Sequence, residues 1–228
     1  MRWVLEPGEV PLFGQERGCA EFEQRRLSFD GASASYWNAD DDEVLYVLSG
    51  AGSATIGGSG SKLAPGTAVY VARATTWRID DADELELLSV LVHDPLPANG
   101  ATHSVVAAGD VEAAEATAGR EFRLLATPEV GCPTVTQFVG YIPVGRAPDH
   151  YHRYDEVVYV LAGEGAFHVD GESAPLRAGS CVHLPAELVH CLENHGPSEM
   201  QVLGVFRPAG SPAEAYYPDG SAAVVLGG

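Results

Sequence analysis

Short runs of apolar and β-branched residues, separated by Gly, Pro, Asp and Ser, recur along most of the chain. Residues 44–48, 68–71, 157–161 and 165–169 are the clearest of these runs, and each has the length of one β-strand. The dipeptide Asp170-Gly171 follows the last run and is typical of a tight hairpin turn. Many short strands between such turns predict an all-β fold, a sandwich or barrel that leaves few strand edges exposed.

Few segments have the period of 3.6 residues expected of a helix, and residues 107–119 are the best candidate. Residues 107–119 are rich in Ala and Glu, and we expect them to form a helix in the connection between two folded parts. The connection places a domain boundary between residues 95 and 120. A chain of 228 residues suits this division, and we predict one domain over residues 1–105 and another over residues 106–228.

An internal repeat supports the prediction of two domains. Residues 43–50 (EVLYVLSG) align without a gap on residues 156–163 (EVVYVLAG), an offset of 113 residues. The same offset places further glycines and apolar residues on one another: Gly52 on Gly165, Gly58 on Gly171, Leu63 on Leu176, Gly66 on Gly179 and Val69 on Val182. The chain therefore contains two copies of one strand-rich unit, and two small barrels are expected.

Four residues of the second copy form a candidate metal site. His150, His152 and Glu156 are separated by even numbers of residues, so an extended strand would point all three to one face. His190 follows a turn that contains Pro185 and begins a returning strand. Three imidazoles and one carboxylate suit Fe, Mn, Ni, Zn or Cu better than Ca or Mg.

The spacing of these residues resembles the two motifs of the cupin superfamily. The first motif has two His separated by one residue, a Glu four residues later and then a Gly, which His150, His152, Glu156 and Gly163 match. The second motif is met by four residues: Gly179, Pro185, His190 and Asn194. The resemblance implies two tandem cupin barrels, double-stranded β-helices of the jelly-roll type, with His150, His152, Glu156 and His190 as the metal ligands.

Two positions depart from the motifs, and both are in loops. The Gly expected six residues before the first His is Gly145, five residues before it, and the Gly expected two residues after the Pro is Glu187.

The first copy lacks the three histidines. The offset of 113 residues places Trp37 opposite His150, Ala39 opposite His152 and Trp77 opposite His190, and only Glu43 is retained. We therefore expect no metal site in the N-terminal barrel. The two tryptophans are expected to fill the interior of this barrel, and an aromatic ligand pocket is the alternative.

Two further residues are candidate catalytic groups. Alternation along residues 181–183 sends Cys181 and His183 to one face, and His183 would contact the metal ligands or the substrate if that face is the interior. The alternative for His183 is a buried structural histidine. Glu187 lies in the loop before His190 and could transfer protons, as His183 could. Residues 206–220, rich in Pro, Gly and Ala, are expected to lie over a barrel mouth or a neighbouring subunit.

The charge of the chain narrows the range of partners. Asp and Glu number 32 against 13 Lys and Arg, a formal net charge of −19, so nucleic acid and anionic membranes are not expected as partners. The sequence has no leader pattern and no apolar run of 18 residues, which predicts a cytoplasmic protein. The four cysteines form no CxxC pair and are expected to be reduced.

A site of three His and one Glu leaves coordination positions open, as a catalytic centre requires. Resemblance to quercetin-dioxygenase-like cupins implies a dioxygenase with one Fe(II) per chain, acting on a small molecule. The first alternative is a redox-neutral isomerase, lyase, decarboxylase or hydrolase that uses Mn, Zn or Ni as a Lewis acid. The second is a binding protein without catalysis. Cupin resemblance also implies a homodimer.

Overall fold

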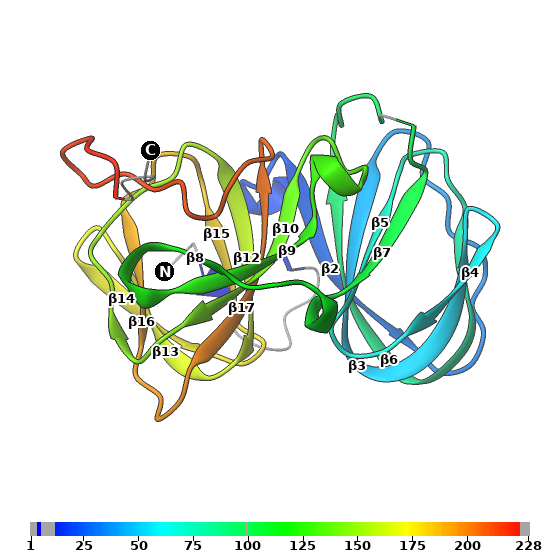
Figure 1. Ribbon diagram of the computed structural model, residues 1–228, viewed down its shortest axis with the longest axis horizontal. Coiled ribbons are helices and arrows are strands. Elements are labelled where there is room, and N and C mark those ends of the chain that lie inside the picture. The colour runs from blue at the N-terminus through cyan, green and yellow to red at the C-terminus, as the bar shows by residue number, and fades with distance from the viewer. Residues whose placement is uncertain (1–3, 6–11, 99, 224–228) are drawn as a thin grey trace. The chain divides into compact units, whose positions relative to one another are not determined.

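The computed structural model describes residues 4–5, 12–98 and 100–223, which form two compact units (Figure 1). The C-terminal barrel contains residues 112–124 and 138–223 together with strand β1 (Val4–Leu5). The N-terminal barrel contains residues 12–111 and 125–137. The chain passes from one unit to the other within strands β9 (Glu121–Ala126) and β10 (Thr136–Ile142).

Strands form nearly all of the regular structure of the N-terminal barrel, as the apolar runs predict. Its six-stranded sheet has the order β2-β6-β3-β5-β7, and β4 pairs with β3. The strands are β2 (Phe22–Phe29), β3 (Asp42–Ile56), β4 (Ser59–Leu63), β5 (Thr67–Val71), β6 (Trp77–Val92) and β7 (His103–Ala107). Three 3-10 turns accompany them: η1 (Gln15–Arg17), η2 (Ala108–Asp110) and η4 (Pro128–Val130).

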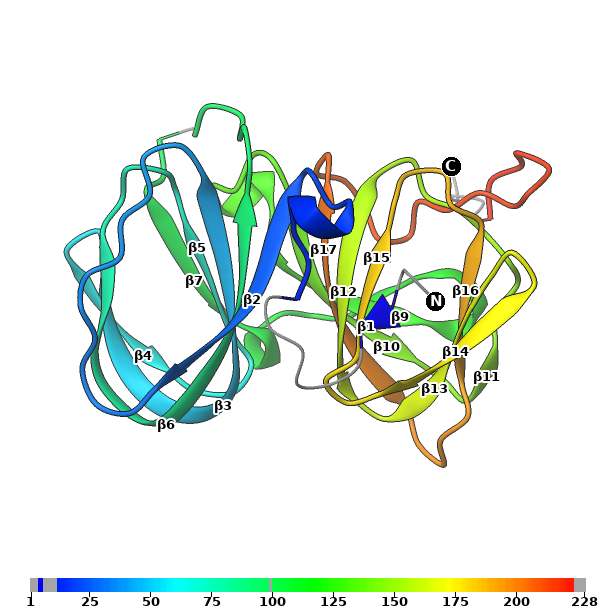
Figure 2. The same ribbon diagram turned by 180° about the vertical axis from the view of Figure 1, so that it is seen from behind.

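The C-terminal barrel consists of two antiparallel sheets. One has the order β1-β15-β12-β17-β10-β9-β8 and the other β11-β16-β13-β14; Figure 2 shows β1 beside β15. The remaining elements are β8 (Ala114–Glu115), η3 (Thr117–Gly119), β11 (Gly145–Arg146), β12 (Asp155–Ala162), β13 (Glu164–Val169), β14 (Glu172–Arg177), β15 (Cys181–Leu184), β16 (His190–Asn194) and β17 (Met200–Arg207).

Apolar side chains from both sheets meet inside the C-terminal barrel. Val158 and Val160 of β12 pack in one cluster with Phe167 of β13 and Leu192 of β16, and all four are buried. A five-residue apolar strand such as 157–161 is therefore central to its sheet, with β15 on one side and β17 on the other. These two strands hold β12 rigidly, and β12 carries the Glu of the first motif.

The helix predicted for residues 107–119 is wrong. This segment forms the turns η2 and η3 and the short strand β8, which pairs with β9 through Ala114 and Phe122. Helical propensity alone does not stabilise so short a helix, which needs an apolar face packed against the protein. Pairing with β9 satisfies the backbone instead.

The repeated glycines after the two long apolar runs have the same backbone role. Gly50 and Gly163 both have positive φ, 75° and 90°. A Cβ at Gly50 would lie 2.2 Å from the carbonyl oxygen of Glu84, and one at Gly163 would lie 2.8 Å from Cα of Met200. Only glycine fits this turn, which explains why the repeat retains it.

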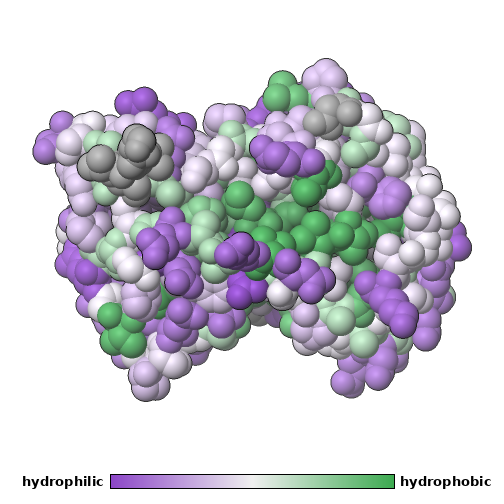
Figure 3. All heavy atoms as spheres, viewed as in Figure 1, coloured by the Kyte–Doolittle hydropathy of each residue, from purple (hydrophilic) through white to green (hydrophobic). Residues whose placement is uncertain are grey.

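Among the described residues, no helix is long and apolar enough to cross a membrane. Hydrophilic side chains are spread over the visible face of each unit in Figure 3.

We predict that Gly163→Ala destabilises the protein more than Gly171→Ala does. Both positions have positive φ, which costs an Ala about 1 to 2 kcal/mol, but a Cβ at Gly171 meets no atom within 4 Å. The further loss of unfolding free energy in Gly163→Ala, compared with Gly171→Ala, reports the clash of the new Cβ with the backbone of Met200 in β17. Urea unfolding of both variants tests this, and equal losses would contradict it.

Candidate metal centre

The three motif histidines are placed by a loop and by a strand end. His150 and His152 precede β12 in a loop rather than in the extended strand expected from their spacing, and His190 is the first residue of β16. Two backbone hydrogen bonds join His150 to His190: each N–H donates to the other's carbonyl, at 3.0 and 2.8 Å. This bridge fixes the loop against the sheet.

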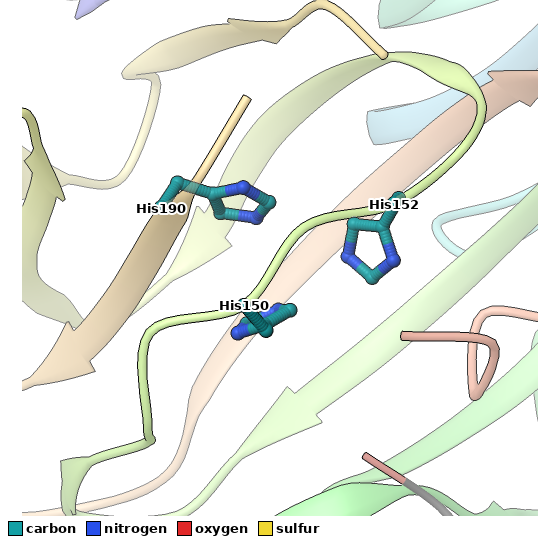
Figure 4. A group of neighbouring side chains, drawn as sticks. All are labelled: His150, His152 and His190. Atoms are coloured by element: carbon teal, nitrogen blue, oxygen red, sulfur yellow. The ribbon is translucent and has the colours of Figure 1, made fainter. Parts of the chain in front are cut away.

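The imidazoles of His150, His152 and His190 converge, as Figure 4 shows. One ring nitrogen from each lies within 4.8 Å of the others. The ring centroids are 4.7 to 5.3 Å apart. Three nitrogens at this separation can share a single ion.

Backbone carbonyls determine which nitrogen each ring presents. In every ring Nδ1 lies 2.8 to 2.9 Å from a carbonyl oxygen: His150 with Pro148, His152 with Glu214 and His190 with Leu188. A carbonyl oxygen only accepts, so each Nδ1 must carry the hydrogen. The lone pair of each neutral ring is then on Nε2, the arrangement found in metal-binding histidines.

The surroundings also keep these rings neutral. Burial lowers the pKa of His190 well below its usual range and lowers that of His150. The pKa of His152 falls to about 3, chiefly through burial and then through the neighbouring His150. At neutral pH the three rings therefore offer lone pairs rather than charges.

Glu156 lies on β12 and faces the same cavity as the histidines. Its carboxylate is not one of the groups within 4.8 Å of each other. Burial, and secondarily the charge of Asp155, raises the pKa of Glu156 to about 8, although Arg120 acts in the opposite direction. Within the described part of the chain, Glu156 accepts no hydrogen bond and forms no ion pair. A buried carboxyl group thus lacks a donor.

The cavity next to these residues has a volume of about 70 Å³, several times the roughly 10 to 15 Å³ that one water requires. Apolar side chains form much of its wall, with Phe138, Leu184 and Leu192 among them. The ring of Tyr154 stacks on that of His152 at a centroid distance of 4.6 Å. The site therefore has room for a small molecule.

The segment 208–223 contributes to the site. Glu214 supplies the carbonyl that holds His152, and Pro212 and Ala215 line the cavity. Tyr216 anchors the segment: its backbone bonds both ways to Tyr151 at 2.9 Å. The expectation that this tail lies over a barrel mouth is confirmed for the barrel that carries the site.

In the N-terminal barrel, Glu43 has the strand position of Glu156 but has several donors. The indole N–H of Trp77 donates to it at 2.9 Å, and Arg25 forms an ion pair with it at 3.2 Å. The hydroxyl of Ser89 also donates to Glu43. Leu45 pairs with Ser89 in the N-terminal barrel, and its counterpart Val158 pairs with Gly204 in the C-terminal barrel. Gly204 is therefore the counterpart of Ser89. Side-chain donors thus surround the carboxylate of Glu43, whereas near Glu156 a glycine takes the place of the serine.

The prediction that Trp37 fills the N-terminal barrel is wrong, because 62% of Trp37 is exposed. The bridge between Tyr36 and Trp77 matches the bridge between His150 and His190, so Tyr36 takes the structural place of His150. Its ring stacks on Trp77 at 4.4 Å. The loop before β3 is therefore shifted by one residue relative to the ungapped offset of 113. Successive side chains of an extended backbone point to opposite faces, so a shift of one residue turns Trp37 outward. Trp77 itself is buried as expected.

His183 and Glu187 do not line the cavity. Leu184 of β15 lines it, so the adjacent His183 points to the opposite face of the sheet, where its Nε2 lies 2.9 Å from the carboxylate of Asp155. Glu187 is exposed, and its backbone N–H donates to the carbonyl oxygen of His152 at 2.7 Å. Its φ of 66° explains why the family pattern has glycine there.

Sequence reasoning missed Arg120, which lines the cavity, and the carbonyl of Glu214. Neither lies in a motif. The segment before β9 was expected to be helical, and a backbone carbonyl leaves no mark in a sequence.

Residues 137–206 match the family model of the Cupin domain. The chain is 35% identical to polyketide synthase CurC of Streptomyces cyaneus, over 37% of this chain and 57% of that protein. It is 38% identical to quercetin 2,3-dioxygenase of Bacillus subtilis, over 28% of this chain and 20% of that enzyme. The chain spans about half the length of the curated relatives that it matches.

Likeness to solved structures covers both barrels. A structure of oxalate decarboxylase from Bacillus subtilis, described with Mn(II) centres, has a TM-score of 0.70 at 17% identity, over 91% of this chain and 75% of that one. The predicted fold class, all-β with two tandem cupin barrels, is confirmed.

We expect Trp77→Ala to destabilise the protein by about 3 to 5 kcal/mol, because it removes a buried indole and a donor to Glu43. Trp37→Ala, at an exposed position, should change stability by about 0.5 kcal/mol or less. Thermal and urea unfolding compare the two variants. Similar losses would contradict the assignment of Tyr36, rather than Trp37, to the interior.

We also predict that metal-free protein loses stability as the pH rises, through Glu156. Its pKa is raised from 4.5 to about 8 on folding, so its contribution is complete below pH 4.5 and is lost as the pH rises through 8. By pH 9 the loss is on the order of a few kcal/mol. Urea unfolding after chelator treatment should show this loss in the wild type and not in Glu156→Gln. An equal loss in both would contradict the prediction.

Proposed function

We propose that the C-terminal barrel binds one divalent transition-metal ion through His150, His152, Glu156 and His190, and that the protein is an Fe(II)-dependent dioxygenase of a small organic molecule. The observation that carries this proposal is the convergence of three neutral imidazoles, each held by a carbonyl at Nδ1, beside a buried carboxyl group that has no donor.

The residues fit such an ion chemically. Neutral imidazole nitrogen and carboxylate oxygen are donors for Fe, Mn, Ni, Zn and Cu. A cation beside Glu156 would offset the cost of its buried negative charge, as Arg25 does for Glu43 in the other barrel. No backbone rearrangement is needed to present the three nitrogens, because their carbonyl partners already fix the rings.

The chain's own groups prepare the cavity for chemistry. When bound, Fe(II) would supply redox chemistry with dioxygen and coordination positions for a substrate. Phe138, Leu184 and Leu192 line the cavity with apolar surface, and a substrate seated against them would displace water, which strengthens electrostatic interactions there. Tyr154, stacked between His152 and Phe206, keeps the ring of His152 in place. The partial likeness to quercetin 2,3-dioxygenase supports the dioxygenase among the cupin activities.

The N-terminal barrel is proposed to serve a structural role. Glu43, the counterpart of Glu156, already has Trp77, Ser89 and Arg25 as partners, so its carboxylate needs no ion. The homodimer expected from the sequence stays a prediction, as do the cytoplasmic location and the exclusion of nucleic acid and membranes as partners.

The test is elemental analysis of protein purified without chelator or nickel resin. We expect about one iron per chain in the wild type and a loss of at least tenfold in His190→Ala, whereas His103→Ala, in the other barrel, should retain the metal. Unfolding temperature of both variants controls for folding. Metal content unchanged in His190→Ala would contradict the ligand assignment.

Oxygen uptake by Fe(II)-loaded protein then tests the reaction against pooled diols, phenols and oxo acids. Substrate-dependent uptake is expected from a dioxygenase. Bound zinc, nickel, copper or manganese without uptake would contradict it and favour an isomerase, lyase, decarboxylase or hydrolase. A protein that holds no metal would be a binding protein.

A further inference from the structure

Arg120 is a cationic side chain that shares the cavity with the metal ligands. Its backbone is fixed where η3 ends, by hydrogen bonds to Thr117 and Ala116. One terminal nitrogen of its guanidinium group donates to the carbonyl oxygen of Leu192 at 3.0 Å. This bond orients the group and uses only one of its five N–H donors.

Arg120 has no acidic partner. Within residues 4–5, 12–98 and 100–223, its guanidinium forms no ion pair with a carboxylate, and Glu121, which lines the same cavity, does not pair with it. Other arginines do have such partners: Arg25 with Glu43, Arg26 with Glu86, Arg78 with Asp80 and Arg146 with Asp149. The chain has 32 acidic residues, yet none of those described lies close enough to pair with this half-buried guanidinium group.

The surroundings of Arg120 make an anion favourable. Burial lowers the pKa of its guanidinium, and Cys191 and Glu156 oppose this only in part. Arginine stays protonated even so, so the cavity contains a positive charge removed from water. A metal ion held by three neutral rings and one carboxylate would add a net positive charge. The cavity would then attract anions although the whole chain carries a net charge of −19.

We propose that the substrate is a small carboxylate with an oxygen on the adjacent carbon, a 2-oxo or 2-hydroxy acid, whose carboxylate is bound by Arg120. This rests on the proposed metal centre, which would receive the second oxygen. A planar guanidinium group matches a carboxylate through two parallel hydrogen bonds. The cavity volume of about 70 Å³ favours a compact molecule, with its two polar ends close together.

The experiment compares pyruvate with pyruvamide, which has the same shape but no charge, by isothermal titration calorimetry of the metal-loaded protein. The wild type should bind pyruvate at least tenfold more tightly than pyruvamide. Arg120→Gln should lose this preference and Arg120→Lys should retain part of it, because Lys keeps the charge without the planar fork. Arg177→Gln, an exposed arginine of the same barrel that does not line the cavity, is the matched control and should bind as the wild type does.

Two results would overturn the proposal: equal binding of pyruvate and pyruvamide, including no binding of either, or wild-type affinity in Arg120→Gln. Metal content and unfolding temperature of each variant are measured alongside, and both should be unchanged in Arg120→Gln. If the wild type holds no metal, the proposed metal centre is rejected. Titration of pyruvate into the metal-free wild type and into Arg120→Gln then tests the role of Arg120 separately. Pyruvate binding that needs Arg120 but no metal would retain the carboxylate site; binding independent of Arg120 would reject it.

Discussion

A buried carboxyl group at the same strand position in each barrel is the constraint on which the interior of both depends. A carboxylate removed from water must be paired with positive charge or hydrogen-bond donors, or it must remain protonated. The N-terminal barrel meets this requirement with Trp77, Ser89 and Arg25 around Glu43. In the C-terminal barrel none of these donors surrounds Glu156, and the three facing imidazoles present lone pairs instead. A cation is the group that satisfies both the carboxylate and the rings.

The strands position this site through backbone contacts more than through side chains. β12 is held between β15 and β17, which fixes Glu156, and the backbone bridge to His190 fixes His150. Each ring is then oriented by a carbonyl from a loop or from the segment 208–223. Because carbonyls are present at every residue, such support survives many substitutions. The orientation of the rings depends instead on the backbone path through these loops, and hence on the turns that set this path.

Much of this arrangement could be predicted from the sequence, since it follows from local spacing. The strand-length apolar runs, the repeat around Gly50 and Gly163, and the set of His150, His152 and His190 are all visible in order along the chain. Trp37 shows where this reasoning fails. A loop that differs by one residue transfers the interior position to Tyr36, and an ungapped offset does not reveal the change. Arg120 and the carbonyl of Glu214 reach the site only through tertiary structure, so no local pattern marks them.

Arg120 completes the electrostatic contrast between the two barrels. Arg25 in the N-terminal barrel is paired with the buried Glu43, so its charge is neutralised within the protein. Arg120 interacts with Glu156 only at longer range and forms no ion pair in the described structure, so its charge is directed to the cavity. Without an ion Glu156 is mostly protonated at neutral pH, because its pKa is raised to about 8. A divalent ion together with the ionised carboxylate would therefore add a net positive charge near Arg120. Metal binding would therefore increase the affinity of the cavity for an anion, which couples the two halves of the proposed site.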